Sequence, residues 1–584
     1  MSDSKPESKP AAPPAPAPVP PAKAPPKNPG MVTFTVDGVE VVAKPGTNMI
    51  DAAKQAGAEI PYYCWHPRLS IAANCRMCLV EAPGPRLVPA CQTPIAEGLK
   101  VTTKSQKVKQ SQKDVMEFLL LNHPVDCSIC DQAGECKLQD YYMRHDHKPS
   151  RLERIGGVED APGMKVLRNK RRQLGPMVVL DQERCILCTR CVRFMDEVAK
   201  EPQLGVFGRG SHERIDVHPV YGKLDNNYSG NVVDLCPVGA LLSTDFRFRA
   251  RAWFLSAAPS VCTGCSRGCS TWADFMGQDV YRYRPRENEQ INKSWMCDKG
   301  RLTYKQLNHP RELEAVIGRG ADAREASRSE AVKYAALKLK PFEGQVHVAI
   351  SPVASNEDIL GALAVARDVF KVESVYVTGR PTGEGDKLLM TADKNSNRKG
   401  LENIAKAFGL ELKPFAALAA GLDEGKVKAL WMVGGEVPEA ADEFAKRLEK
   451  AEVVVVQAMN EDSVSQSATA VLPASTHLED EGSFTNVDGI TQRFRRAYPP
   501  RGDSQPHWKW ALELAKELGA SMAYASSREL FKALAPSVPE LAQFGWDKLA
   551  PMNKAHRGSA ILPTAADGRP PGWRDEGVPR MRGI

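Results

Sequence analysis

The chain has 584 residues, of which 42% are hydrophobic and 26% are charged, and this composition excludes a wholly disordered protein. Its length predicts about three to five domains. The net charge of +7 is small for 63.9 kDa, and we interpret its densest basic run, residues 168–172, as a solvated or partner-facing loop rather than a nucleic-acid site. The longest apolar stretches are much shorter than the roughly 18 residues of a membrane span, so we expect a cytoplasmic protein.

The thiols are confined to one part of the chain. All fifteen cysteines lie between Cys64 and Cys297. A disulfide framework fits poorly, because the count is odd, the chain is long and no segment resembles a secretory signal. We therefore expect reduced cysteines that serve a common purpose in this region.

The first elements predict a small ferredoxin-like domain. Residues 1–30 are rich in proline and lysine and are expected to be a disordered tail. Strands are predicted at 32–36 and 39–42 with a turn at Asp37-Gly38, and a short helix follows that Gly57 ends. Strand, tight turn, strand and helix are the opening of a β-grasp fold of the plant-ferredoxin kind.

The remaining predicted elements are small units around the cysteines before Pro310 and a regular alternation of strands and helices after it. A helix is predicted over 105–122, with Val108, Val115, Phe118 and Leu119 on its apolar side, followed by loop and short helix at 123–147. A short α+β segment is expected at about 177–250, and another small, cysteine-bearing unit at 253–311. Beyond them, strand-like runs alternate with helical patterns, which indicates a parallel, doubly wound α/β domain. The strands are predicted at 346–350, 374–377, 429–433, 453–457 and 469–472, and the helices at 358–370, 401–408 and 440–451.

The first cysteine group follows the β-grasp pattern. It consists of Cys64, Cys75, Cys78 and Cys91, with a CxxC pair at its centre. Zinc and iron–sulfur clusters both accept four cysteines, so the spacing alone does not decide between them. The preceding fold favours a [2Fe–2S] cluster, although the first gap is longer than in plant-type ferredoxins. His66 stands beside this complete set and is interpreted as structural.

The second group has only three cysteines, Cys127, Cys130 and Cys136. A fourth ligand is needed, and His123 lies four residues before Cys127 at the end of the predicted long helix. We therefore predict that His123 is a ligand of a [4Fe–4S] cluster. A neutral imidazole in place of a thiolate should raise the cluster's potential.

Two further groups have spacings typical of [4Fe–4S] clusters. The first of these is a CxxCxxC run that ends with a distant Cys-Pro, and the second is a CxxCxxxC run with a distant cysteine. The third group is Cys185, Cys188, Cys191 and Cys236, and the fourth is Cys262, Cys265, Cys269 and Cys297. With His123, the fifteen cysteines fill four sets of four and leave none over.

Several clusters in one chain indicate electron transfer. Arg76, Arg184, Arg190 and Arg193 flank the ligands and either offset the charge of the clusters or are exposed loop residues. No GxGxxG motif follows a predicted strand, so flavin and hydride chemistry are expected on partner chains.

The order of these motifs resembles the large iron–sulfur subunit of bacterial NADH:quinone oxidoreductase, respiratory complex I, over roughly residues 31–500. The local sequences Cys185–Phe194 and Asp234–Leu241 also resemble this family. The resemblance implies an electron-transfer subunit of a proton-translocating oxidoreductase, which passes electrons from a flavin- and NADH-binding subunit toward quinone. It implies partners in the peripheral arm, no nucleic acid, a membrane contact only through partners, and a location on the cytoplasmic side of the plasma membrane. In the family, the fourth cluster is optional.

The implied fold class is multidomain, α+β followed by α/β. The expected domains are a tail (1–30), a [2Fe–2S] β-grasp domain (31–106), a [4Fe–4S] domain with one His and three Cys ligands (107–147), a ferredoxin-like [4Fe–4S] domain (148–252), a [4Fe–4S] domain of the molybdopterin-oxidoreductase type (253–311), a degenerate molybdopterin-oxidoreductase-like α/β domain (312–557) and an extended tail (558–584).

The last domain raises a rival function. Residues Val471–Ala474, Glu479, Gly482, Phe484, Asn486 and Gly489 resemble molybdopterin oxidoreductases, so an NAD-linked formate dehydrogenase is the alternative. No cysteine beyond Cys297 is present to bind molybdenum, and little chain follows Ala474 to enclose a pterin, so no molybdenum cofactor is expected. Iron-only hydrogenases resemble the first two cysteine groups, but their active-site cluster needs several further cysteines downstream, and this sequence has none there. A scaffold protein with zinc at all the groups is the non-redox alternative.

Overall fold

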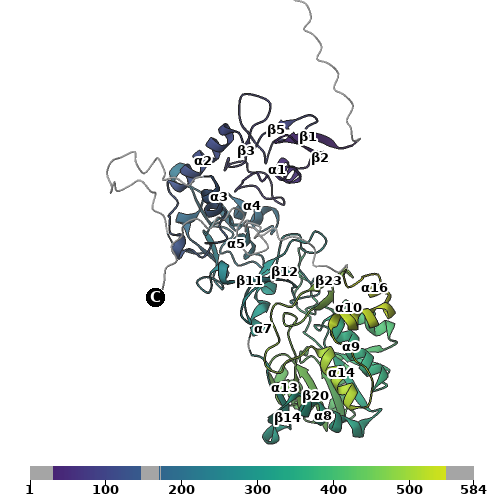
Figure 1. The fold of residues 1–584 in the computed structure, drawn as a ribbon. Helices are drawn as coiled ribbons and strands as arrows, with labels where there is room; N and C mark the ends of the chain where they lie inside the picture. Colours follow the sequence, from purple (N-terminus) through teal and green to yellow (C-terminus); the bar gives the residue numbers. More distant parts are fainter. Residues whose placement is uncertain (1–29, 146–169, 171, 309, 548–584) are drawn as a thin grey trace, which may run out of the picture. The chain divides into compact units, whose positions relative to one another are not determined.

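A computed structural model describes residues 30–145, 170, 172–308 and 310–547 (Figure 1). Apart from Gly30, both predicted tails lie outside the described residues. The chain forms two compact units, Met1–Trp65 with Ala73–Val115 and His66–Ala72 with Met116–Ile584. Each unit is described by itself below.

The first unit has the predicted β-grasp opening. Strands β1 (Val32–Val36) and β2 (Val39–Ala43) form an antiparallel hairpin, and β5 (Lys100–Val101) pairs with β1 in parallel. Asp37 and Gly38 have φ angles of 51° and 85°, which is the positive pair that a type I′ turn needs. A second hairpin joins β3 (Leu79–Val80) and β4 (Val88–Pro89).

A short helix closes this unit as predicted. In α1 (Met49–Ala53) the side chain of Asn48 caps the first turn by accepting from the Ile50 amide at 3.0 Å. The helix continues as η1 (Lys54–Ala56) and ends at Gly57, whose φ is 67°. The core beneath it includes Phe34, Val36, Val41, Met49 and Ile50.

The predicted helix over 105–122 is α2 (Gln106–Leu120). Its buried stripe runs through Val108, Gln112 and Met116, each one turn apart. The prediction of an apolar side was right for Val108 and wrong for Phe118, which is 75% exposed. Phe118 lies off this stripe, and the polar Gln112 takes the position that hydrophobicity alone would assign to an apolar residue.

The second unit begins with small elements that lie around cysteines. The helices are η2 (Cys127–Ile129), α3 (Lys137–His145), η4 (Gln182–Arg184), α4 (Arg190–Glu197), η5 (Gly210–His212) and α5 (Asn231–Leu235). The strands are β6 (Arg172–Gln173), β7 (Val178–Leu180) and β10 (Leu241–Ser243) in one sheet, and β8 (Leu204–Phe207) with β9 (Arg214–Val217). Cys191 lies in α4, and Cys236 follows the last residue of α5, so the third group is anchored by two helices.

A three-stranded antiparallel sheet carries the fourth group. Its strands are β11 (Ser256–Val261), β12 (Ser270–Met276) and β13 (Asp279–Pro285). The short helices η6 (Ala252–Phe254), α6 (Asp298–Arg301), η7 (Leu302–Tyr304) and α7 (Lys305–Asn308) flank it. Cys297 is the capping residue of α6.

The α/β domain has an eight-stranded sheet in the order β15-β14-β21-β20-β19-β16-β17-β18. All neighbouring pairs from β21 to β18 are parallel, which confirms the predicted doubly wound sheet, and β14 is antiparallel to β21. The strands are β14 (Ala315–Ile317), β15 (Arg324–Ala326), β16 (Val346–Ile350), β17 (Ser374–Val377), β18 (Glu411–Pro414), β19 (Ala429–Val433), β20 (Val453–Ala458) and β21 (Ala470–Pro473).

Helices cover both faces of this sheet (Figure 1). One face packs on α8 (Arg328–Leu339), α9 (Asn356–Asp368), α10 (Arg398–Ala407), α14 (His507–Glu517) and α15 (Ser527–Leu534). The other packs on α11 (Phe415–Asp423), α12 (Ala441–Leu448) and α13 (Ser463–Gln466). In β20, Val453 and Val455 belong to the first core and Val454 and Val456 to the second, because side chains alternate along a strand.

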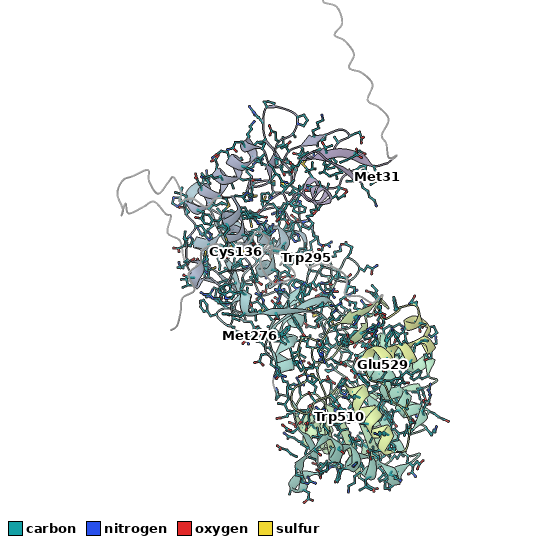
Figure 2. All side chains as sticks on the ribbon, viewed as in Figure 1. Met31, Cys136, Met276, Trp295, Trp510 and Glu529 are labelled. Carbon is teal, nitrogen blue, oxygen red and sulfur yellow. The ribbon has the colours of Figure 1, made fainter. Side chains whose placement is uncertain are left out.

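The remaining elements complete this domain. They are η8 (Gly320–Asp322), η9 (Lys340–Phe342), η10 (Ala535–Ser537), α16 (Pro539–Ala542) and the hairpin of β22 (Gly482–Thr485) and β23 (Thr491–Phe494). Trp510 on α14, labelled in Figure 2, is fully buried. Its indole N–H donates to the Pro473 carbonyl at 2.7 Å. Over the described residues, no helix has both the length and the hydropathy to cross a bilayer.

Candidate metal centres

The first cysteine group lies wholly in the first unit and is arranged as two pairs. The Cys64 amide donates to Cys75 Sγ at 3.5 Å, and the thiols of these two residues interact. The thiols of Cys78 and Cys91 form the second pair. Hydrogen bonding to Cys64 and burial raise the pKa of Cys75, and the same effects, with Cys91 as partner, raise the pKa of Cys78. Two thiol pairs suit a cluster in which each of two irons takes two protein ligands.

The third group lines a small apolar cavity. All four of its cysteines line this space. The other lining residues are Leu180, Ile186, Thr189, Arg190, Ile215, Val238, Ala240 and Leu241. Leu187 and Thr189, which separate the first three cysteines, have φ angles of 53° and 59°. This left-handed backbone turns the loop sharply, so that its thiols face one centre.

Burial makes the thiols of the third group reluctant to ionise on their own. It raises the pKa of Cys236 to about 11, and it also raises the pKa of Cys191, where the three neighbouring thiols add to the effect. Thiolate is the form that binds metal. A cationic iron centre would offset this cost, so the donor set and the apolar cavity fit an iron–sulfur cluster.

Two thiols of the fourth group pack against Gly300. A Cβ atom at Gly300 would lie 3.0 Å from Cys262 Sγ and 3.2 Å from Cys297 Sγ, so a side chain there would crowd both thiols. The Gly300 amide donates to Cys297 Sγ at 3.3 Å, and the Gly264 amide donates to Cys262 Sγ at 3.4 Å. Burial raises the pKa of Cys262 to about 12 and that of Cys297 to about 11. Cys269 is also buried and interacts electrostatically with the other three thiols.

The second group is less enclosed than the others. Cys130 and Cys136 are buried, whereas Cys127 is exposed. Burial raises the pKa of Cys136 to about 12, and the charges of Cys130 and Cys127 act in the same direction. His123 is half-buried just beyond α2, where its amide donates to the Leu119 carbonyl at 3.2 Å. Its ligation stays a prediction.

The second and third groups are direct neighbours. The amide of Lys137, next to Cys136, donates to the carbonyl of Pro237, next to Cys236, at 3.0 Å. Arg184, which precedes Cys185, forms an ion pair of 2.8 Å with Asp126, which precedes Cys127. The two ligand loops are thus joined both by the backbone and by an ion pair.

The four arginines beside the ligands have different environments. Arg184 and Arg190 are each only 4% exposed, so the interpretation as exposed loop residues is wrong for these two. Arg190 donates to the Leu235 carbonyl at 3.2 Å, and Arg193 donates to the Cys188 carbonyl at 3.2 Å. Arg76 is exposed, with a φ of 58°.

His66 packs on an aromatic ring of the second unit. Its imidazole stacks on Trp295 with ring centroids 5.4 Å apart (Figure 2 labels Trp295). Burial, followed by the charges of Arg190 and other nearby cations, lowers the pKa of His66 to about 3.

Among the described residues, no three His, Cys, Asp or Glu side chains are placed around the position of a single metal ion.

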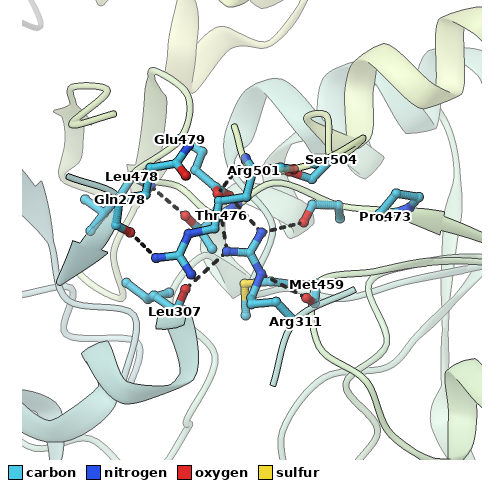
Figure 3. A network of polar contacts seen from close by, with 12 residues as sticks. Gln278, Leu307, Arg311, Met459, Pro473, Thr476, Leu478, Glu479, Arg501 and Ser504 are labelled. Atoms are coloured by element: carbon cyan, nitrogen blue, oxygen red, sulfur yellow. Dashed lines mark hydrogen bonds and ion pairs between the residues drawn. The ribbon is translucent and has the colours of Figure 1, made fainter. Parts of the chain in front are cut away.

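The molybdopterin-oxidoreductase-like motif serves in packing. Glu479 forms a buried ion pair of 2.8 Å with Arg311 (Figure 3). A Cβ atom at Gly482 would lie 2.6 Å from Glu357 Oε2. Asn486 accepts from two amides of the β22–β23 turn, where Gly489 has a φ of 78°. Each of these residues therefore has a structural role in this chain.

A pocket lies at the carboxyl ends of the parallel strands, where the strand order reverses between the paired strands β16 and β19. Ser351 and Gly434, which follow these two strands, both line it. The guanidinium of Arg380, also in the lining, donates to the carbonyl of Thr263 at 2.5 Å and thereby holds the loop of the fourth group. The Arg380 guanidinium is therefore already hydrogen-bonded within the protein.

Five protein-family models match the chain. In chain order they are a 2Fe-2S iron-sulfur cluster binding domain (30–106), the NADH-ubiquinone oxidoreductase-G iron-sulfur binding region (112–151), the ferredoxin-like domain of NADH-quinone oxidoreductase subunit 3 (175–242), the 4Fe-4S domain of NADH-ubiquinone oxidoreductase NDSU1/NuoG-like proteins (262–305) and molybdopterin oxidoreductase (318–517). These matches confirm the predicted fold class and the presence of domains that bind both cluster types.

Curated relatives agree with these models. A subunit of the NADH-quinone oxidoreductase of Rickettsia conorii is 38% identical over 56% of this chain and 48% of its own length, so this match spans about half of that protein. The mitochondrial NADH-ubiquinone oxidoreductase 78 kDa subunit of Candida albicans is 28% identical over 90% of this chain and 89% of that subunit. The corresponding subunit of Neurospora crassa is 30% identical over 88% of this chain and 84% of that subunit. The chain therefore belongs to the family of the iron–sulfur subunit of NADH-quinone oxidoreductase, respiratory complex I, which includes the bacterial NuoG-like proteins and the mitochondrial 75 and 78 kDa subunits.

Proposed function

We propose that this chain is the electron-transfer subunit of a proton-translocating NADH:quinone oxidoreductase, which passes electrons from a flavin- and NADH-binding subunit toward quinone. The observation that carries this proposal is the third cysteine group, whose four members line one apolar cavity in a chain of this family. Bound iron–sulfur clusters would supply one-electron chemistry, and the catalytic sites for NADH and quinone would lie on other subunits.

The proposed ligands fall into four sets. Cys64, Cys75, Cys78 and Cys91 hold a [2Fe–2S] cluster, and three sets hold [4Fe–4S] clusters. These three are His123 with Cys127, Cys130 and Cys136; Cys185, Cys188, Cys191 and Cys236; and Cys262, Cys265, Cys269 and Cys297. The domain limits predicted from the sequence assign one cluster to each domain between residues 31 and 311.

The protein holds neighbouring ligand loops together, which is what a chain of redox centres requires, since electron transfer slows steeply with distance. The bond between Lys137 and Pro237 and the ion pair between Arg184 and Asp126 support direct transfer between the second and third groups. The subunit would work in the peripheral arm on the cytoplasmic side of the membrane, which it would reach only through its partners.

The α/β domain is proposed to be a scaffold without a molybdenum cofactor. Glu479 and Gly482 are engaged in packing, and Arg380 holds the loop of the fourth group. No cysteine follows Cys297. These features favour the complex I function over the alternative, an NAD-linked formate dehydrogenase.

Metal analysis tests the cluster assignment. We expect the chain, purified without oxygen, to contain about fourteen iron atoms with matching acid-labile sulfide, since one [2Fe–2S] and three [4Fe–4S] clusters are proposed. Zinc without sulfide would identify a zinc scaffold and overturn the electron-transfer role. Stoichiometric molybdenum would instead favour the formate dehydrogenase.

The His123 assignment has its own test. In His123→Cys a thiolate would replace the neutral imidazole, and we expect the second cluster to remain with a lowered reduction potential. An EPR-monitored redox titration measures this shift. His145→Cys, which adds the same thiol at the end of α3, serves as the matched control and should leave the potential unchanged. An unaltered spectrum and potential in His123→Cys would show that the imidazole is not a ligand.

A further inference from the structure

The ligand loop of the fourth group, residues 262–269, is held by a hairpin of the α/β domain. Three residues, 266–268, separate Cys265 from Cys269, and the carbonyl of each accepts a hydrogen bond from the β22–β23 hairpin. The donors are the Val487 amide to Ser266 at 2.8 Å, the Asn486 side chain to Arg267 at 3.3 Å and the Gln492 side chain to Gly268 at 2.6 Å. The hairpin therefore fixes the backbone of the whole spacer between these two cysteines.

Gln492 on β23 binds the residues on both sides of Cys269. Its Nε2 donates to the carbonyl of Gly268, which precedes this cysteine, and its Oε1 accepts from the hydroxyl of Ser270, which follows it. Gln492 is only 8% exposed, and Ser270 is fully buried. A side chain without a donor at position 492 would leave the buried Gly268 carbonyl without this hydrogen bond, which is costly away from water. The carboxamide of Gln492 thus matches both of its partners.

Apolar and backbone contacts join the same hairpin to the start of the ligand loop. Val261, the last residue of β11, packs with Phe484 on β22 and Phe494 on β23, and all three side chains are buried. The amide of Arg495, which follows β23, donates to the carbonyl of Pro259 on β11 at 3.1 Å. The hairpin is therefore anchored beside the loop, so the hydrogen bonds of Gln492 have a fixed origin.

These hydrogen bonds affect how readily a cluster in this loop would accept an electron. A carbonyl oxygen is the negative end of the peptide dipole. Because the hairpin donors bind the three spacer carbonyls, these oxygens are held toward the hairpin and cannot turn toward the ligand sulfurs. Reduction adds negative charge to a cluster, and its potential depends on the hydrogen bonds and dipoles around it. The arrangement should therefore keep the reduction potential higher than it would be with unbound carbonyls.

We propose that Gln492 is a positioning residue for the fourth cluster, which fixes the backbone around Cys269 and thereby raises the reduction potential of that cluster. The inference rests on the proposed function, which assigns a [4Fe–4S] cluster to the fourth group. It also gives the α/β domain a specific task in this chain. The hairpin that carries the molybdopterin-oxidoreductase-like residues Gly482, Phe484 and Asn486 supports a ligand loop.

Gln492→Met tests this role in the full chain, purified without oxygen. Methionine is unbranched like glutamine but has no donor, so the Gly268 carbonyl loses its partner. We expect the fourth cluster to be retained with a lowered reduction potential, while the iron content and the signals of the other clusters match the wild type. An EPR-monitored redox titration with iron analysis measures this. Gln543→Met is the matched control, because the exposed Gln543 also donates to a backbone carbonyl, that of Glu540 on α16, and it should leave every potential unchanged.

An unchanged potential of the fourth cluster in Gln492→Met would overturn the proposal. Gln492→Glu keeps the acceptor for Ser270 but adds a negative charge, so a shift in this variant and not in Gln492→Met would show an effect of charge alone and would also overturn it. If Gln492→Met loses the fourth cluster, Ser270→Ala decides, because it removes the hydroxyl that donates to Gln492: a lowered potential supports the proposal and an unchanged one overturns it. A wild-type chain without the fourth EPR signal would instead count against the proposed function itself, so the two failures are distinguishable.

Discussion

Gly239→Ala is expected to remove the second cluster while the first remains. A Cβ atom at position 239 would lie 2.3 Å from Cys130 Sγ and 3.1 Å from the Cβ of Gln132. Side chains do not approach each other this closely, so either Cys130 or the loop that contains Cys236 must move. We expect a loss of about four of the roughly fourteen iron atoms, together with the EPR signal of the second cluster.

Gly435→Ala is the control for this substitution. A Cβ atom at Gly435 would lie 3.6 Å from Ala458, which is an ordinary contact, so iron content and spectra should be unchanged. If Gly239→Ala kept its full iron content and an unaltered spectrum, the second and third ligand loops would not be packed as closely as these distances indicate. Loss of both the second and the third signals would place the movement in the loop of Cys236 instead.

The regular elements of the α/β domain could be predicted from the sequence because their side chains follow simple patterns. The runs at 346–350, 374–377 and 429–433 became β16, β17 and β19 with the predicted limits, since each contains β-branched or aromatic residues that favour strands. Helices α8 and α14 were not predicted. The strand β14, antiparallel to its neighbour β21, also had no distinct pattern.

The grouping of the cysteines could be predicted from their spacing, whereas their surroundings could not. A CxxCxxC run fixes local geometry, because its residues are close in the chain. The bond between Lys137 and Pro237 joins residues 100 positions apart, and no local pattern indicates it. The burial of Arg184 depends likewise on Asp126 in another loop. The need for glycine at positions such as Gly239 and Gly300 can be recognised only in the structure, where thiols pack against them.

Arg311→Met is expected to destabilise the α/β domain by about 3–5 kcal/mol. The side chains of Arg311 and Glu479 are 2% and 0% exposed, so the substitution leaves a buried carboxylate without its cation. Arg311 also donates to the carbonyls of Leu307 and Met459, which tie the residues after the fourth group to the sheet (Figure 3). Urea unfolding followed by tryptophan fluorescence measures the change, because Trp431 and Trp510 are buried in this domain.

Two further variants separate the ion pair from the packing around it. Arg528→Met removes a partner of the exposed Asp547, and we expect it to cost less than about 1 kcal/mol. The double variant Arg311→Met, Glu479→Leu removes both buried charges, so it should recover part of the lost stability even though the carbonyls of Leu307 and Met459 lose their donor. A double variant that is as unstable as Arg311→Met alone would show that hydrogen bonds determine the stability and not the buried charge. These are the bonds of Arg311 to the two carbonyls and those of the Thr476 and Arg501 amides to Glu479. In that case Arg311 would act mainly as a clamp between the residues after the fourth group and the sheet, and Glu479 would serve to hold its guanidinium in place.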